Sequence, residues 1–270
     1  MEEILKDLSG PALVQAIEAN LTAFLRDQAR SPEVEWHEEP ELSWYITGIG
    51  YHNFNRIVRA QFAAGDTDRR IAEALSLFRS RGVPMIWHTG PGTRPMDLDA
   101  VLSDFGLKCA HREPGMAVDL SQLPEDFPAA ENLKIERISD LEAARDWCRT
   151  AARSFGMPAW VSEPLVRIED SLGLGRHPWR RLYLGRVADQ IVATSLLFLG
   201  AGVAGLYSVT TIPEARRRGI GEAMTLAPLL EARSMGYRIG TLHASALGLN
   251  IYLRLGFREL CRLSRYVWRP

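Results

Sequence analysis

RRRGIG is the sequence at Arg216-Arg217-Arg218-Gly219-Ile220-Gly221, between a strand-like run (206–211) and a helix-like run that ends near Gly236. The first backbone N–H groups of a helix have no partner within the helix, and the helix dipole favours negative charge there. Both glycines lack the Cβ atom that would hold an anion away from the backbone. The three arginines add forked donors that suit phosphate oxygens. The stretch therefore predicts a phosphate-binding turn.

This turn matches neither of two common phosphate-binding motifs. A Walker loop needs Gly-x-x-x-x-Gly-Lys followed by Ser or Thr, and the chain has no such run. A dinucleotide fingerprint would need a third glycine at the position of Met224. Taken alone, RRRGIG is weak evidence, because an arginine run beside glycine is most often a solvated turn. Pro228 falls inside the following helix, where it removes one hydrogen bond and predicts a kink or bend.

The downstream residues contain a second motif. A short strand-like run (237–244) leads into a helix-like run that closes in YLRLGF at 252–257, with Gly256 placed as a glycine helix stop. In this order and at this spacing, Arg-x-x-Gly-x-Gly and Tyr-x-x-Leu-Gly-Phe resemble the two signatures of the GNAT superfamily of N-acetyltransferases. The resemblance covers about 132–270 and is strongest over 203–257.

The resemblance implies a fold class and a domain organisation. It implies the GNAT acyl-CoA N-acyltransferase fold, an α/β protein of the α+β type with a mixed sheet. LSDFGL at 102–107 also places a helix-ending glycine before an apolar residue and a terminal strand, so we expect a tandem of two GNAT-like domains. The expected domains are 1–122, a degenerate GNAT-like or structural or substrate-shaping unit rather than a second active site, and 133–270, the catalytic unit. A Pro- and acid-rich linker at 123–132 separates them.

The resemblance also implies where acetyl-CoA binds. In the family the sheet splays open beside the fourth strand, whose backbone binds the pantetheine arm, which here implies Val209, Thr210 and Thr211. The Val209 N–H would stabilise the oxyanion that forms when an amine attacks the thioester. The alternative is that these residues form an ordinary buried strand.

The phosphate-binding turn would hold the pyrophosphate of the same cofactor. Its N–H groups over 216–221 would donate to the phosphate oxygens, supported by Arg216 and by Arg217 or Arg218. Ser245 stands where the family often has asparagine, so its hydrogen bond to the pantetheine is expected from a shorter side chain.

Three residues are candidates for proton transfer, one as the acid and two as alternatives for the base. Tyr252 matches the family's general acid, and a phenol can protonate a departing thiolate because their ordinary pKa values are about 10 and 8.5. The strand at 203–211 has no glutamate to act as base. His243, or Tyr207 through a water molecule, is the candidate base. The structural alternatives are a packing tyrosine and a structural histidine.

Composition excludes several classes of protein. The chain has 270 residues, 46% of them hydrophobic and 24% charged, and a net charge of −1. Such a charge creates no uniform field to recruit nucleic acid, and no apolar run reaches the length of about 18 residues that predicts a membrane span. Three cysteines, Cys109, Cys148 and Cys261, lack metal or disulfide spacing. We therefore expect no metal and a reducing cytoplasm as the compartment. The sequence does not fix the oligomeric state and leaves a homodimer open.

The sequence predicts an acetyl-CoA-dependent N-acetyltransferase that acts on a primary amine of a small molecule or peptide. Two alternatives stay open. One is a non-catalytic CoA-binding or regulatory module, which the missing glutamate and the substituted asparagine would suit. The other is transfer of a larger acyl or aminoacyl group.

Overall fold

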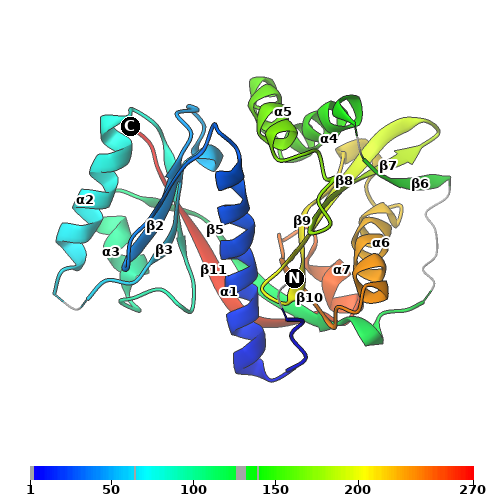
Figure 1. The fold of residues 1–270 in the computed structure, drawn as a ribbon, viewed down its shortest axis with the longest axis horizontal. Helices are drawn as coiled ribbons and strands as arrows, with labels where there is room; N and C mark the ends of the chain where they lie inside the picture. The colour runs from blue at the N-terminus through cyan, green and yellow to red at the C-terminus, as the bar shows by residue number, and fades with distance from the viewer. Residues whose placement is uncertain (1–2, 64, 126–131, 139) are drawn as a thin grey trace. The chain divides into compact units, whose positions relative to one another are not determined.

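The computed structural model describes residues 3–63, 65–125, 132–138 and 140–270, so most of the expected linker lies outside the described residues. The chain divides into two compact units. Unit 1 consists of Met1–Phe24 and Gly115–Leu260, and unit 2 consists of Leu25–Pro114 and Cys261–Pro270. Figure 1 shows the elements of both units.

Unit 1 contains a mixed sheet with helices on both faces. Its strands follow the order β5 (Lys108–Asp119, from Gly115 onward in this unit), β10 (Ile239–His243), β9 (Val203–Thr211), β8 (Gln190–Gly200), β7 (Arg180–Val187) and β6 (Leu133–Arg137). β9 and β10 are parallel, and the other neighbours are antiparallel. Its helices are α1 (Gly10–Asp27, with Gly10–Phe24 in this unit), α4 (Leu141–Ser154), α5 (Ser162–Ser171), α6 (Ile220–Ser234) and α7 (Leu249–Arg254).

Two hydrophobic cores lie on the two faces of this sheet. Strand side chains alternate between faces, and neighbouring residues of β8 accordingly enter different cores, Leu197 with α6 and α7 and Leu196 with α4 and α5. The α6 helix is apolar on most of its surface and continues through buried Pro228 to its end. The loss of one backbone hydrogen bond therefore does not end this helix.

Unit 2 repeats the same plan in a smaller form. Its strands follow the order β1 (Glu35–Glu38), β2 (Leu42–Ile46), β3 (Arg56–Ala60), β4 (Met85–Thr89) and β11 (Arg258–Trp268, from Cys261 onward in this unit). β3 and β4 are parallel, as β9 and β10 are in unit 1. The helices α2 (Thr67–Ser80) and α3 (Leu98–Asp104) cover a single core that includes Phe78 and Trp87.

In each unit, the strand at one end of the strand order belongs to the shorter of two sequence segments or continues from the other unit's segment: β5 in unit 1 and β11 in unit 2. β5 follows α3, and its residues Gly115–Asp119 pair antiparallel with β10 in unit 1. β11 follows α7, and its residues Ser264–Trp268 pair antiparallel with β4 in unit 2. The sequence-based division into 1–122 and 133–270 cuts the chain once, whereas each compact unit combines two separate segments. The roles expected for the two parts stay predictions.

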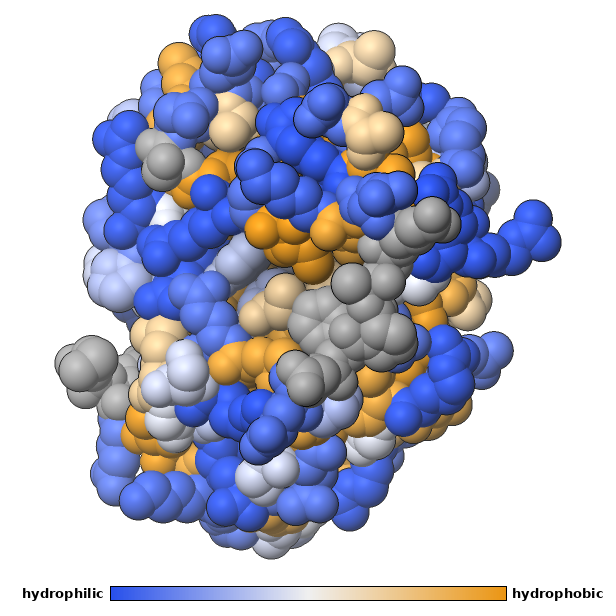
Figure 2. Space-filling model, turned by 90° about the vertical axis from the view of Figure 1, so that its right-hand side faces the viewer, coloured by the Kyte–Doolittle hydropathy of each residue, from blue (hydrophilic) through white to orange (hydrophobic). Residues whose placement is uncertain are grey.

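The surface carries scattered apolar residues. On the face shown in Figure 2, hydrophilic residues predominate and apolar residues appear in patches among them. Large exposed apolar side chains include Met96, Trp160 and Leu247. No helix within the described residues combines the length and apolar character that crossing a membrane requires.

Candidate functional site

The sheet of unit 1 opens between its two parallel strands. β9 and β10 pair from Ala204 with Gly240 to Leu206 with Leu242, and β10 ends one residue later at His243. β9 continues to Thr211, and over these last residues it keeps β8 as its partner on the other side. The carboxyl ends of β9 and β10 therefore form a fork, which is where open α/β sheets bind ligands.

A β-bulge lies in β9 at this fork. Thr194 pairs with Thr210 and Leu196 pairs with Tyr207, so one residue of β8 faces two residues of β9, Ser208 and Val209. Ser208 has a positive φ of 48°, and its carbonyl accepts a hydrogen bond from Thr194 Oγ1 at 2.8 Å. The bulge changes which backbone groups of β9 point into the fork.

The direction of these backbone groups follows from the register beyond the bulge. The Ile212 N–H donates to the Val192 carbonyl on the β8 side. Because successive amides of a strand point to opposite sides, the N–H groups of Thr211 and Val209 point toward the fork. Thr210 is buried, with its hydroxyl 2.8 Å from that of Thr194. The fork thus contains a backbone donor at Val209, the residue that the sequence analysis singled out.

The basic turn leads from the end of β9 into α6. Arg217 and Gly219 have positive φ values of 61° and 76°, and α6 begins at Ile220. Arg216 Nε donates to the Thr211 carbonyl at 3.1 Å, while the side chains of the three arginines are exposed. The arginines therefore stand at the amino end of a helix, beside the open end of β9.

Only one of the two glycines in this turn is required by the fold. The left-handed conformation of Gly219 is one that residues with a side chain rarely adopt. A Cβ on Gly221 would meet only ordinary contacts, with Ile251 Cδ1 at 3.4 Å and Thr211 Oγ1 at 3.8 Å. The packing of the protein itself leaves room for a methyl group at Gly221, facing the end of β9.

Tyr252 lies on α7, which packs against the same core as α6. Its side chain is buried and meets the Phe257 ring edge to face at 5.8 Å. A Cβ on Gly248 would lie 2.7 Å from Tyr252 Cε2, so this glycine gives the phenol ring its space. Ser245 is exposed, and its hydroxyl and carbonyl both accept from the Gly248 N–H, which caps the start of the helix. The Ser245 side chain thus has a local partner.

Tyr207 is held in place by the amino-terminal helix. Its hydroxyl donates to Asn20 Oδ1 at 2.7 Å, and Asn20 Nδ2 donates to the Gly200 carbonyl at 2.8 Å. The Phe24 ring stacks on Tyr207 at a centroid distance of 4.0 Å. Burial raises the pKa of Tyr207, so this phenol stays protonated at neutral pH and donates its proton to an amide. These contacts argue against Tyr207 as the candidate base. They favour His243, whose ring centroid lies 6.2 Å from that of Tyr207.

Asn20 and Phe24 are residues of this site that the sequence analysis did not find. They come from a helix far from the two motifs in sequence, and no local pattern connects them with β9. Asn20 is nevertheless fully buried, and it interrupts the apolar spacing of Leu13 and Ile17 on α1. A polar residue on a helix face that is otherwise apolar was the available signal, since buried polar groups need partners.

The described residues do not contain a group of three His, Cys, Asp or Glu side chains that could hold a metal ion. The three cysteines, all among the described residues, are not joined in disulfides, and Cys148 is buried. Burial raises the pKa of the Cys148 thiol well above its ordinary value, which makes it unreactive.

In unit 2 the corresponding fork is filled by the chain itself. β3 and β4 pair in parallel over two residue pairs, the last of them at Ile57. Beyond that point, residues 90–95 lie against the end of β3. The Arg94 N–H donates to the Ala60 carbonyl at 3.1 Å, and the Phe62 N–H donates to the Arg94 carbonyl at 3.0 Å. This loop thus takes the backbone partners that an extended ligand would need.

The helix that follows β3 also differs from α6. Its N-cap is Asp66, and its first turn contains Asp68. Arg69 contacts the Asp66 carboxylate at 3.0 Å, so this arginine is already paired. Negative charge at a helix amino end opposes phosphate binding. Among the described residues of unit 2, the counterpart of the fork is therefore occupied and acidic.

Comparisons with known proteins identify the fold. No family model and no curated protein matches the sequence. Solved structures match along nearly the whole chain. A GCN5-related N-acetyltransferase from Kribbella flavida has a TM-score of 0.70 at 18% identity, covering 93% of this chain and 95% of that one. A GCN5-related N-acetyltransferase from Sphaerobacter thermophilus has a TM-score of 0.62 at 17% identity, covering 99% and 95%.

A tandem GNAT protein from the clavulanic acid biosynthesis pathway has a TM-score of 0.57 at 14% identity, covering 98% of this chain and 97% of that one. Two GNAT-like units and a mixed α/β sheet, as predicted from the sequence, are thus confirmed for this fold.

Proposed function

Because the chain has the fold of the GCN5-related N-acetyltransferases, we propose that it transfers an acetyl group from acetyl-CoA to a primary amine of a small molecule or peptide. The observation that carries this proposal is the fork between β9 and β10, with the Val209 amide on one side and the basic turn at the start of α6. The fold alone supports acyl transfer, and these residues supply the reason to name CoA as the donor.

The residues of the fork suit CoA chemically. The pantetheine arm would pair with the open side of β9, where the N–H groups of Val209 and Thr211 point into the fork. The pyrophosphate would take the first N–H groups of α6, and Arg216 to Arg218 would neutralise its charge. Room for a methyl group beside Gly221 supports this assignment, because a close phosphate gives a reason for a glycine there that packing does not give.

The residues around the fork suggest how the transfer would proceed. The Val209 N–H would donate to the thioester carbonyl oxygen and stabilise negative charge on it as the amine attacks. Tyr252 would give a proton to the departing thiolate. His243 would accept a proton from the amine, directly or through water. Unit 2 would have a structural or substrate-shaping role, because its own fork is filled. Cysteines that are not joined in disulfides suit the reducing cytoplasm proposed as the compartment.

Calorimetry of CoA binding tests the proposal. Changing Arg216 and Arg218 to alanine should weaken binding by about 1.5–3 kcal/mol for each charged hydrogen bond that the change removes, or roughly tenfold to a hundredfold each. A matched control changes Arg145 and Arg149 of α4 to alanine, which removes the same charge from exposed positions elsewhere in unit 1. Equal affinity in both variants and the wild type would remove the phosphate assignment.

Two further measurements separate the remaining alternatives. Release of free thiol from acetyl-CoA in the presence of an amine panel distinguishes an enzyme from a non-catalytic CoA-binding module. Comparison of acetyl-CoA with longer acyl-CoA donors distinguishes acetyl transfer from transfer of a larger acyl group.

A further inference from the structure

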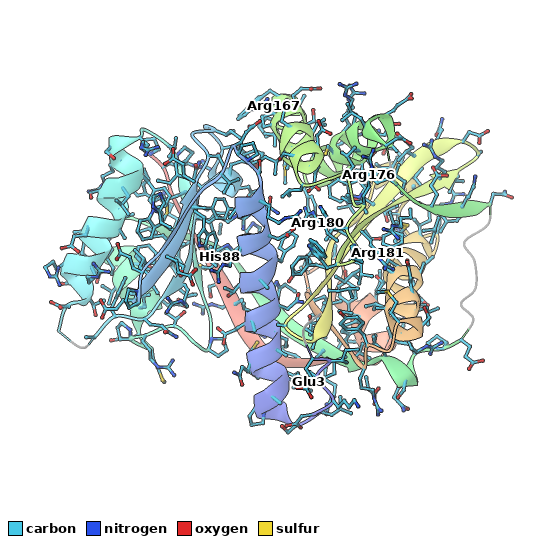
Figure 3. All side chains as sticks on the ribbon, viewed as in Figure 1. Glu3, His88, Arg167, Arg176, Arg180 and Arg181 are labelled. Atoms are coloured by element: carbon cyan, nitrogen blue, oxygen red, sulfur yellow. The ribbon has the colours of Figure 1, made fainter. Side chains whose placement is uncertain are left out.

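One face of the sheet in unit 2 carries basic side chains from three neighbouring strands. Trp87 of β4 packs in the core with α2 and α3, so His88, the next residue, faces the opposite side. Arg265 of β11 pairs directly with His88 and shares its face. Arg56 of β3 reaches the same place, with Nη1 2.9 Å from His88 Nε2. Figure 3 labels His88 on this sheet. We call Arg56, His88 and Arg265 the basic row.

We propose that the basic row binds a small oxyanion, a carboxylate or a phosphate group, at a site separate from the CoA fork. The proposal does not depend on the proposed acetyltransferase activity. It concerns unit 2, whose own fork is filled.

The charges in this row do not balance. Arg265 contacts one carboxylate, that of Glu113, at 2.6 Å. Arg56 has neutral partners, because Nε donates to the Asn53 carbonyl at 2.8 Å and Nη1 meets an imidazole. Within the described part of unit 2, Glu113 is the one carboxylate in contact with either guanidinium. Two guanidinium groups thus share one counter-charge.

More basic groups surround the row. Burial lowers the pKa of His52 to about 4, and the positive charges of Arg269, Arg56, Arg265 and His111 add to this effect. His52 is therefore neutral at pH 7 and brings no charge of its own. The effect of Arg269 on the same imidazole places a third guanidinium, which is exposed, near the basic row. Three guanidinium groups and one carboxylate leave two positive charges in excess.

One donor in the row also has no hydrogen-bond partner. Arg265 Nε is buried, and no partner for it exists among the described residues. A buried donor without a partner is costly, and so is a partly buried charge without a counter-charge. An oxyanion would correct both, since its oxygens accept from several N–H groups at once and its charge offsets the excess.

Thermal unfolding of the full chain tests this site. The probes are inorganic phosphate and succinate, each compared with sodium chloride at equal ionic strength. We expect at least one of them to raise the midpoint in a saturable way. A response to succinate alone assigns a carboxylate ligand, a response to phosphate alone assigns a phosphate, and a response to both assigns a general oxyanion site. No response beyond that of chloride would overturn the proposal.

Variants locate the response. Arg56→Gln should lower the affinity for the probe at least tenfold. The matched control is Arg59→Gln on the same strand, and it should leave the affinity unchanged, because the Arg59 guanidinium donates to the carbonyls of Glu39 and Pro40 instead. If Arg56→Gln does not fold, Arg269→Gln serves as the second variant. It removes an exposed charge and should weaken binding of the probe several-fold. An unchanged affinity in the folded variants at Arg56 and Arg269 would refute the site.

The anion response must also be separated from the CoA fork. The variant with alanine at Arg216 and Arg218 should keep the full response to phosphate and succinate. Loss of the response in that variant would assign the anion to the basic turn of unit 1 instead and would contradict the proposal.

Discussion

Changing Gly205 to alanine tests whether the amino-terminal helix is built into unit 1. Gly205 lies on β9 just before the fork, and a Cβ there would lie 1.9 Å from Asn20 Oδ1 and 2.8 Å from the Tyr207 ring. Asn20 cannot move away at low cost, because it is fully buried and makes hydrogen bonds to Gly200 and Tyr207. The substitution must therefore displace α1, the tyrosine or both.

The expected cost follows from two contributions. Overpacking a filled core costs about 1–3 kcal/mol, and each broken hydrogen bond costs about 1 kcal/mol. Together these predict a decrease of about 2–5 kcal/mol in the free energy of unfolding. At about 3 °C for each kcal/mol in a domain of this size, the unfolding midpoint should fall by about 6–15 °C.

Calorimetric or fluorescence unfolding measures this decrease. The control is Gly10→Ala at the start of α1, where an added Cβ would have no atom within 4 Å. Asn20→Ala should partly rescue Gly205→Ala, because it removes the atom that the new methyl group meets. A Gly205→Ala midpoint equal to that of the control, or strictly additive effects of the two changes, would refute the packing of α1 on β9.

Three more predictions concern the site and its supports. Gly248→Ala should displace the Tyr252 ring and lower thiol release about as much as Tyr252→Phe, by about 100-fold, with CoA affinity kept; full turnover in both variants would make the phenol a packing residue. Arg238 hydrogen bonds hold the pKa of Asp119 at about 2, below its ordinary 3.8. This carboxylate therefore stabilises the fold above pH 3.8, and the stabilisation is lost as the pH falls through 2. Arg238→Ala should consequently raise the pH at which half of the protein is unfolded in an acid titration. Calorimetry should find one CoA for each chain, since the fork of unit 2 is filled, and a stoichiometry of two would contradict this.

The parts of the fold that depend on residues adjacent in the chain could be predicted from the sequence. The basic turn was predictable because a strand, glycines and a helix start are adjacent in the chain, and Gly219 does adopt the left-handed conformation expected of such a turn. The helix with Tyr252 was predictable from its glycine stop. The roles of these residues stay predictions. In contrast, the need for glycine at position 248 has no sequence signature, because its contact with the Tyr252 ring is visible only in three dimensions.

Features that depend on distant parts of the chain could not be predicted in this way. The bulge at Ser208 has no sequence signature, since a non-glycine residue there adopts a positive φ that its neighbours impose. The role of Asn20 depends on a strand, β9, that lies far from α1 in the sequence. The basic row likewise combines residues of β3, β4 and β11, and only the strand order brings them together.

The exchange of β5 and β11 has a consequence for how the chain folds during its synthesis. β4 is made early, but its partner at Ser264–Trp268 is made only after every strand of unit 1. The sheet of unit 2 therefore cannot close until those residues have left the ribosome, and pairings so distant in sequence form slowly. A fragment that stops near residue 122 would leave β4 with an unpaired edge, which is a template for aggregation. We therefore expect that neither half of the sequence completes its sheet without the other half.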